Sequence, residues 1–129
     1  MVTDPISDLI IRIQNASRAK KESMSLPFSQ MKLAIAEVLQ QEGYIAAVDK
    51  KSKKEGKLTL SLAYKNGASV VQGVKRISKP SRRVYFSVHD VKPVKRGYGL
   101  LVLSTPAGVM SGKQAKIKHV GGEALFEIW

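Results

Sequence analysis

The chain has 129 residues, of which 43% are hydrophobic, and its 22 Lys and Arg against 10 Asp and Glu give a formal net charge of +12. It has no cysteine, which excludes disulfides and thiolate metal sites. The apolar content is enough for one domain or two small ones. The charge excess predicts a polyanionic partner, first of all nucleic acid. No apolar run reaches membrane-spanning length and no signal peptide is visible, so we expect no membrane partner.

A first helix is expected to begin at Asp4-Pro5, where Asp accepts from free N–H groups and Pro needs no acceptor. Four apolar residues at helical spacing predict its buried stripe: Ile6, Leu9, Ile10 and Ile13. Arg12 and Asn15 lie off this stripe. They are either solvated or in contact with a partner, and the pattern does not decide between the two.

A second helix is expected after the short extended segment ESMSLPF, with Ser29 as its cap and Gly43 at its end. Its expected buried residues are Met31, Ile35, Val38 and Leu39. Strands follow at YIAAV and at the alternating KLTLSLAY, separated by a basic hairpin tip at Lys50–Lys57. The alternation predicts one face carrying Leu58, Leu60, Leu62 and Tyr64. Asn66-Gly67 is expected to turn a hairpin into the strand SVVQGVKRI.

A domain boundary is expected near Ser78–Ser81, because Pro80 cannot continue a central strand. This gives an N-terminal domain of residues 1–77, ordered helix, strand, helix, strands, and a C-terminal domain of residues 82–129. The C-terminal domain is expected to be a mixed sheet with one short helix, so the fold class is α/β of the α+β kind. Residues 1–77 and residues 78–129 each carry +6, so the shorter second part is the denser cation.

The second part predicts strands at Arg83–Val88, Tyr98–Ser104 and Glu123–Trp129, the middle one central because it is apolar on both faces. In the first of them Arg83 and Tyr85 share one side. An Arg beside a Tyr on a polar sheet face can hold phosphate and stack a base. An ordinary half-buried Tyr explains the pattern equally well.

The segment STPAGVMSGKQAK resembles a phosphate-binding loop, but the required G-x-x-x-x-G-K-[ST] pattern fails at two positions. Ala107 takes the place of the first glycine and Gln114 that of the hydroxyl residue. Ser111 and Gln114 instead predict a capping box for a short helix to about His119, closed by Gly121-Gly122.

Before this helix, Ser104 and Thr105 emerge from the central strand, and Gly108 permits close backbone approach. Hydroxyls on a rigid loop can contact base edges and riboses of unpaired RNA. Lys113 and Lys116 on the helix serve either solubility or phosphate contact.

Enzymatic chemistry is poorly supported. His89 and His119 are the only imidazoles and lack metal-ligand spacing. A triad of Ser104, His119 and Glu123 has nothing to position an oxyanion hole. We therefore expect no enzyme, no metal, no cofactor and no small-molecule substrate. The charge also permits a sequence-tolerant architectural protein that binds nucleic acid non-specifically, although no helix-turn-helix is recognisable.

Four segments resemble, in order along the chain, the family of bacterial small-subunit ribosomal protein eight: DPISDLIIRIQNA, SQMKLAIAEVLQQEGYI, RISKPSRRVY and STPAGVMSGKQAKIKHVGGE. The resemblance implies a two-domain α/β protein that binds 16S rRNA directly and helps to assemble the central domain. Neighbouring small-subunit ribosomal proteins would be its other partners. Its expected location is the cytoplasmic ribosome, and an organellar ribosome remains open.

The resemblance also implies site residues. Ser104 and Thr105 correspond to the family's serine/threonine loop, Tyr85 to the aromatic after a basic pair, and Gly121, Gly122 and Glu123 to a Gly-Gly-Glu element. The expected RNA contacts are Arg12, Asn15, Lys79, Arg82, Arg83, Tyr85, Ser104, Thr105, Gly108, Lys113, Lys116, Gly121, Gly122 and Glu123. The sequence departs from the family where Pro106 stands third in a common Ser-Thr-Ser, and where Ser111-Gly112-Lys113 replaces a common Thr-Asp-Arg.

Overall fold

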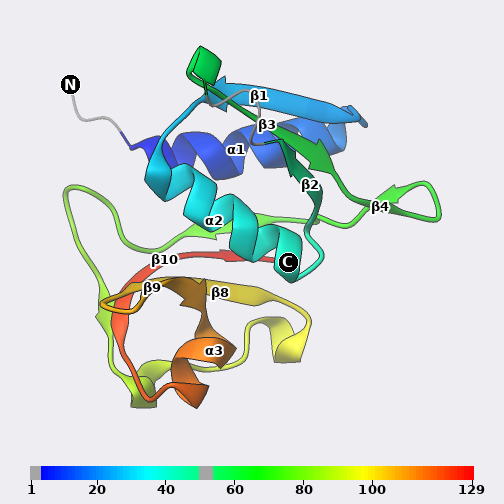
Figure 1. Ribbon diagram of the computed structural model, residues 1–129. Coiled ribbons are helices and arrows are strands. Elements are labelled where there is room, and N and C mark those ends of the chain that lie inside the picture. Colours follow the sequence, from blue (N-terminus) through cyan, green and yellow to red (C-terminus); the bar gives the residue numbers. More distant parts are fainter. Residues whose placement is uncertain (1–3, 50–53) are drawn as a thin grey trace. The chain divides into compact units, whose positions relative to one another are not determined.

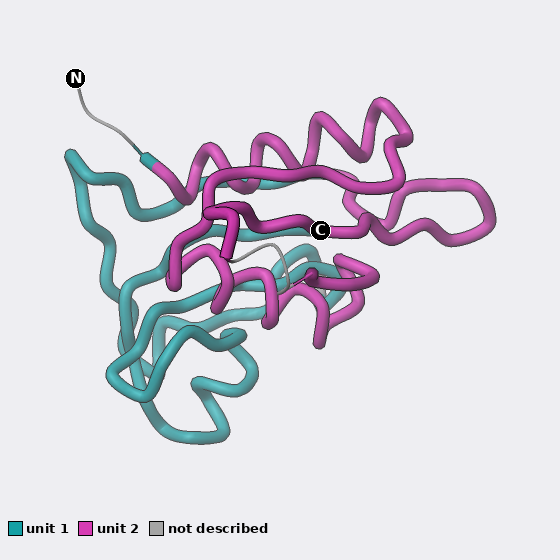
Figure 2. The backbone as a smooth tube through the Cα atoms, turned by 45° about the horizontal axis from the view of Figure 1, so that its top comes forward, with its two compact units in different colours: residues 1–4, 73–129 teal, residues 5–72 magenta. Residues whose placement is uncertain are grey.

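A computed structural model describes residues 4–49 and 54–129 (Figure 1). The chain divides into two compact units, one of residues 5–72 and one of residues 1–4 and 73–129 (Figure 2). This division falls earlier in the chain than the boundary expected near Ser78–Ser81. The expected boundary between two domains stays a prediction. Helices and antiparallel sheets occur in both units, so the α+β class is confirmed.

The unit of residues 5–72 packs two helices against a three-stranded antiparallel sheet. Its elements are α1 (Pro5–Arg18), β1 (Ser23–Pro27), α2 (Gln30–Gln41), β2 (Ile45–Asp49), β3 (Lys57–Leu62), β4 (Tyr64–Lys65) and β5 (Ala68–Ser69). The sheet order is β1-β3-β2, α1 contacts β1 and β3, and α2 contacts β2. The expected stripe of α1 and the three leucines of β3 are buried, as the periodicity predicts. Residues 50–53 of the expected hairpin tip lie outside the described residues.

Both ends of α2 are confirmed. The Ser29 hydroxyl accepts from the Lys32 N–H at 3.1 Å, which satisfies one of the helix's free donors. At the other end Gly43 has φ +85°, and the N–H groups of Gly43 and Tyr44 donate to the carbonyls of Gln40 and Leu39. This is the Schellman arrangement that a glycine at this position predicts.

The expected buried face of α2 is wrong at Met31, which is 41% exposed, while Lys32 is only 7% exposed. The Lys32 ammonium donates to the Pro27 carbonyl at 3.1 Å, so the side chain lies along the protein with its charge satisfied. The hairpin turn at Asn66-Gly67 is confirmed, but the continuous strand SVVQGVKRI expected after it is wrong, because only Ser69 and, later, Val74–Arg76 are strand. Here the turn joins only the short strands β4 and β5, and the chain then leaves this unit's sheets.

The unit completed by residues 73–129 is built on one antiparallel sheet in the order β6-β10-β8-β9, with β7 also pairing β10. Its elements are β6 (Val74–Arg76), β7 (Tyr85–Phe86), the 3₁₀ turns η2 (Val88–Asp90) and η3 (Lys95–Gly97), β8 (Leu100–Thr105), β9 (Gly108–Ser111), α3 (Gly112–Ile117) and β10 (Gly122–Ile128). All described pairs are antiparallel, where a mixed sheet was expected. Strand β9 was not expected at all, and β7 is shorter than the strand predicted at Arg83–Val88.

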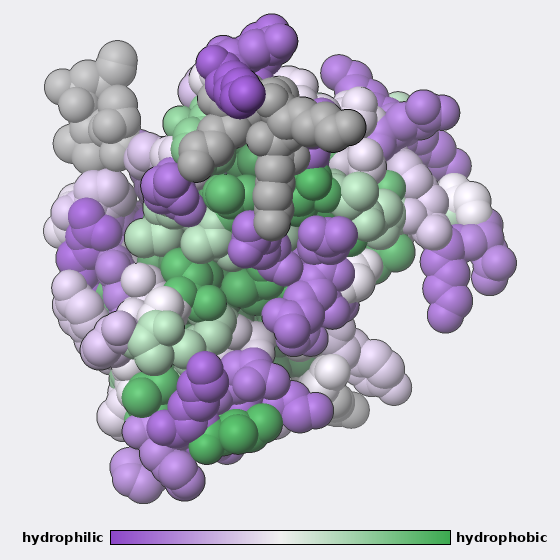
Figure 3. All heavy atoms as spheres, in the orientation of Figure 1, coloured by the Kyte–Doolittle hydropathy of each residue, from purple (hydrophilic) through white to green (hydrophobic). Residues whose placement is uncertain are grey.

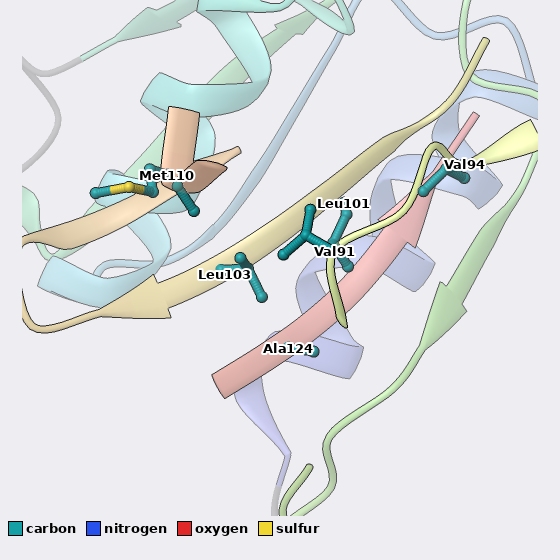
Figure 4. Packing of buried hydrophobic residues seen from close by; sticks show 7 residues of the cluster. Val91, Val94, Leu101, Leu103, Met110 and Ala124 are labelled. Carbon is teal, nitrogen blue, oxygen red and sulfur yellow. The ribbon is translucent and has the colours of Figure 1, made fainter. Parts of the chain in front are cut away.

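A cluster of buried apolar side chains forms the core of this unit on one face of the sheet (Figure 4). Leu101 and Leu103 extend from β8 and Ala124 from β10, and Val91 comes from the connection before β8 (Figure 4). Ala115 of α3 lies in the same cluster. The core therefore fixes the positions of β8 and β10, whose ends carry the expected contacts Ser104, Thr105, Gly122 and Glu123.

Candidate nucleic-acid interface

Three of the expected contact residues form a row across neighbouring strands. Glu123 of β10 pairs with Tyr85 of β7 on one side and with Ser104 of β8 on the other. Directly opposed residues of antiparallel strands project to the same face, so these three side chains lie next to one another. Tyr85 is 69% exposed, which leaves its ring available to a partner.

The glycine pair before Glu123 makes this row possible. A Cβ on Gly122 would overlap the Ser104 carbonyl oxygen, and one on Gly121 would overlap the Phe86 carbonyl oxygen. Only glycine permits β10 to enter so closely between the two strands. The expectation that Gly121-Gly122 close the short helix is therefore wrong. Helix α3 ends at Ile117 with Lys118 as its cap, and His119 just beyond it has φ +54° and donates its N–H to the Lys116 carbonyl.

Glu123 is bound to the protein's own groups. Its Oε2 accepts hydrogen bonds from the Ser78 hydroxyl and from Arg83 Nη1, the latter at 2.9 Å. Burial acts to raise the pKa of Glu123, but these hydrogen bonds and the charges of Arg83 and Arg76 outweigh it, so the pKa is lowered. Glu123 is ionised at neutral pH, and its role is to position Arg83 and Ser78 beside the row.

The basic residues Lys79, Arg82 and Arg83 lie in a loop, residues 79–83, that interrupts a strand. Ser78 donates its N–H to the Ala124 carbonyl, and the Val84 carbonyl accepts from the Ala124 N–H. The segment therefore stops pairing with β10 at Ala124 and resumes pairing at the same residue. The Ser78 hydroxyl also accepts from the Val84 N–H at 3.1 Å and is fully buried. Lys79 and Arg82 exchange two backbone hydrogen bonds across the loop. The loop is thus closed at its base and presents its cations outward.

The two hydroxyl residues at the end of β8 differ in their surroundings. The Thr105 hydroxyl donates to the Gly108 carbonyl at 2.8 Å and accepts from the Ala107 N–H at 3.1 Å. It therefore holds the β8–β9 turn, where Gly108 has φ +117°. Ser104 has no side-chain hydrogen bond to the described residues and, as the preceding strand residue, projects to the opposite face of the sheet. Of these two residues, Ser104 is therefore the one whose hydroxyl makes no hydrogen bond to the described residues, and it lies in the row.

Other expected contacts lie elsewhere. Lys113 and Lys116 of α3 line a groove with Lys92 and the start of β8, whereas Ser104 is at that strand's end. The N-cap of α3 is confirmed, since the Ser111 hydroxyl accepts from the Gln114 N–H at 3.1 Å. Figure 3 shows hydrophobic atoms among hydrophilic ones on the surface over α3, where Ile117 is exposed. The structure does not bring these lysines to the row.

Arg12 and Asn15 belong to the unit of residues 5–72 and line a polar groove between α1 and β1. The Arg12 Nε donates to both carboxylate oxygens of Asp8 at 3.0 Å. Both partners of this ion pair are about half exposed, and such surface pairs contribute little to stability.

Ser78 was missed as a site residue, because in the sequence it marked only the approach to Pro80. A buried hydroxyl beside a carboxylate is a long-range arrangement that no local pattern signals. Within residues 4–49 and 54–129, no group of three or more His, Asp and Glu side chains is placed to hold a metal ion. None of the helices described there is long and apolar enough to cross a membrane.

Comparison with known proteins identifies the family. The model of the family "Ribosomal protein S8" matches residues 4–129. The small ribosomal subunit protein uS8 of Nitratidesulfovibrio vulgaris (strain DP4) is 47% identical, with both chains fully covered. The uS8 proteins of Mycoplasma mobile and Agrobacterium fabrum are 45% and 43% identical, and the alignments cover 100% and 99% of this chain and 98% of each relative. The chain belongs to the ribosomal protein S8 family of the small ribosomal subunit.

Proposed function

We propose that the chain binds 16S rRNA directly and helps to assemble the central domain of the small subunit. In this proposal it holds an irregular or unpaired part of an rRNA helix mainly through residues 78–129, as a structural component rather than a catalyst. The observation that carries it is the row of Tyr85, Glu123 and Ser104 beside the cationic loop 79–83.

Each part of this surface suits a different feature of RNA. The Tyr85 ring offers a stacking surface for an unpaired base, and the Ser104 hydroxyl can donate to and accept from a base edge or a ribose. Arg83, held by Glu123, and the exposed Lys79 and Arg82 offer charge to phosphates. A regular duplex hides its base faces, so the combination favours a distorted helix.

The remaining expected contacts take supporting or separate roles in the proposal. Gly121, Gly122 and Glu123 position the row, and Thr105 and Gly108 hold the adjoining turn. Lys113, Lys116, Arg12 and Asn15 would meet other rRNA. Neighbouring small-subunit proteins are the further partners, and the cytoplasmic ribosome is the proposed location.

Crosslinking in a cell extract, followed by sequencing of the bound RNA, tests the proposal. We expect the crosslinks to concentrate in one region of 16S rRNA. Crosslinks spread evenly over unrelated transcripts would favour a non-specific architectural protein instead. Titration of the purified chain with the identified rRNA helix and with a scrambled helix of equal length then measures the preference at fixed salt.

A further inference from the structure

A second cationic surface lies on the opposite face of the sheet from the Tyr85–Glu123–Ser104 row. It is an open groove of about 440 Å³, here called the Lys75 groove, lined by Lys75, Arg76, Ile77, Lys79, Arg82, Val84, Phe86 and Glu127. Lys75 pairs with Glu127, and Glu127 pairs with Leu101 of the core, which places the groove on the core-bearing face. Phe86 follows Tyr85 in β7 and therefore projects to this face.

The cations at the rim of the Lys75 groove are uncommitted. Lys75, Lys79 and Arg82 are exposed and have no side-chain hydrogen bond or ion pair to the described residues. Arg76 is different, because its guanidinium is bound to Asp4 at 3.0 Å and to the Leu125 carbonyl. Glu127 is the groove's one acidic group. The rim therefore carries an excess of positive charge that the protein itself does not use.

The floor of the groove has a different chemistry. Ile77, Val84 and Phe86 are half-buried and make it apolar, with one aromatic ring. An apolar floor surrounded by exposed cations fits a ligand that is flat and apolar in one part and anionic in another. An unpaired nucleotide has both parts, since its base can lie on an aromatic ring while phosphates meet Lys and Arg.

The loop 79–83 connects this groove with the row. Arg83 is bound to Glu123 of the row, whereas Lys79 and Arg82 of the same loop line the groove. A single RNA strand that extends from the row around this edge of the sheet would therefore stay in contact with positively charged side chains. This continuity favours RNA over an acidic peptide as the occupant.

We propose that the Lys75 groove binds an unpaired nucleotide of the RNA, with its base on Phe86 and its neighbouring phosphates at Lys75, Lys79 and Arg82. The inference extends the proposed function, on which it rests, to a second contact on the other face of the sheet.

The test uses the full chain and a fluorescently labelled single-stranded oligouridylate of about eight nucleotides, titrated at several salt concentrations. Lys75→Ala should weaken binding about three- to tenfold and reduce the slope of log affinity against log salt by about 0.7. Glu127→Gln should strengthen binding, because it removes the groove's own negative charge. Phe86→Leu should weaken binding about threefold or more with an unchanged slope, since it removes stacking but no charge.

Matched controls separate the groove from general charge. Lys118→Ala and Glu22→Gln change the net charge by the same amounts at exposed positions outside the groove. If Lys75→Ala and Glu127→Gln behave like these controls, the proposal is wrong. It is also wrong if polyglutamate displaces the oligouridylate from the parent chain but not from Lys75→Ala, since the groove would then prefer an acidic peptide.

The rRNA helix, titrated in parallel, distinguishes this proposal from the proposed function. If Ser104→Ala weakens binding of the rRNA helix and Lys75→Ala leaves it unchanged, the proposal for the Lys75 groove is wrong and the proposed function still stands. Oligouridylate binding that depends on Lys75, in a chain with no preference for the rRNA helix, would support the groove and contradict the function.

Discussion

Particular cations of the two units are held differently. In residues 5–72, Arg12 is paired with Asp8 and the Lys32 ammonium is bound to the Pro27 carbonyl. In residues 73–129, the cations Lys79 and Arg82 stand on a loop whose base is closed by Ser78 and Glu123. A count of charges does not distinguish these arrangements. A candidate RNA surface is identified by cations that the fold positions and leaves without partners.

The largest expected effect compares glycines of the two units. Gly122→Ala should lower the free energy of unfolding by about 3 kcal/mol, because the new Cβ overlaps the Ser104 backbone. Gly67→Ala has open space around it and only the strain of φ +79°, so it should cost about 1–2 kcal/mol. Urea unfolding followed by the fluorescence of Trp129, the single tryptophan, and by circular dichroism measures both. A greater loss for Gly67→Ala would contradict the close-approach argument.

The second effect compares neighbouring residues of β8. Ser104→Ala should weaken binding to the specific rRNA helix about ten- to hundredfold, since a buried RNA group loses its partner. The salt slope should not change, because no charge is removed. Thr105→Ser keeps the hydroxyl that holds the turn and should bind within about threefold of the parent. Equal affinities for Ser104→Ala and the parent would remove Ser104 from the interface.

A third prediction concerns pH. The folded-state pKa of Glu123 is lowered, so its contribution to stability is complete above the unfolded-state pKa and is lost as the pH falls through the folded-state pKa. Glu123→Gln should cost about 1 kcal/mol at neutral pH and progressively less in acid. Unfolding measured from neutral to acidic pH tests this. Parallel curves for the variant and the parent would mean that the carboxylate charge does not stabilise the fold.

The smallest effect concerns arginines of the two units. Arg82→Ala should weaken binding to the rRNA helix a few-fold and make the salt dependence shallower by about 0.7–0.9 in slope, as expected for one lost phosphate contact. Arg12→Ala should bind the same helix within about twofold. For the parent chain we expect log affinity against log salt to have a slope of about −3 to −6, which corresponds to roughly five to seven phosphate contacts. A larger loss for Arg12→Ala would place the main contact in residues 5–72.

Local signals predicted much of the fold from the sequence. The stripe of α1, the Ser29 cap and the Gly43 end of α2 depend on residues within one or two turns, and the structure has all three. The expectation that Met31 is buried is wrong, and Lys32 is buried instead. Which of the two is buried depends on the surroundings of the helix and on the Pro27 carbonyl, five residues from Lys32. Strand β9 was missed because the turn at Pro106 lacks the usual hairpin residues.

The candidate site was predictable in its residue types but not in its arrangement. The sequence predicts Tyr85, Ser104 and Glu123 as contacts, yet their side-by-side position depends on two strand pairings between distant segments. Gly121-Gly122 resemble a helix end in the sequence, because a sequence does not show which backbone will pass close to a glycine. The partner of Glu123, Ser78, depends on the same tertiary contact.

The loop of residues 79–83 has a consequence for association between chains. Strands β6 and β7 lie along the outer side of β10, and an uninterrupted strand there would offer a row of free N–H and C=O groups to another chain. The loop interrupts this series of backbone groups with Pro80 and three cations. The same residues that are proposed to attract RNA therefore also protect this edge of the sheet from strand addition and aggregation while the protein is free of its partner.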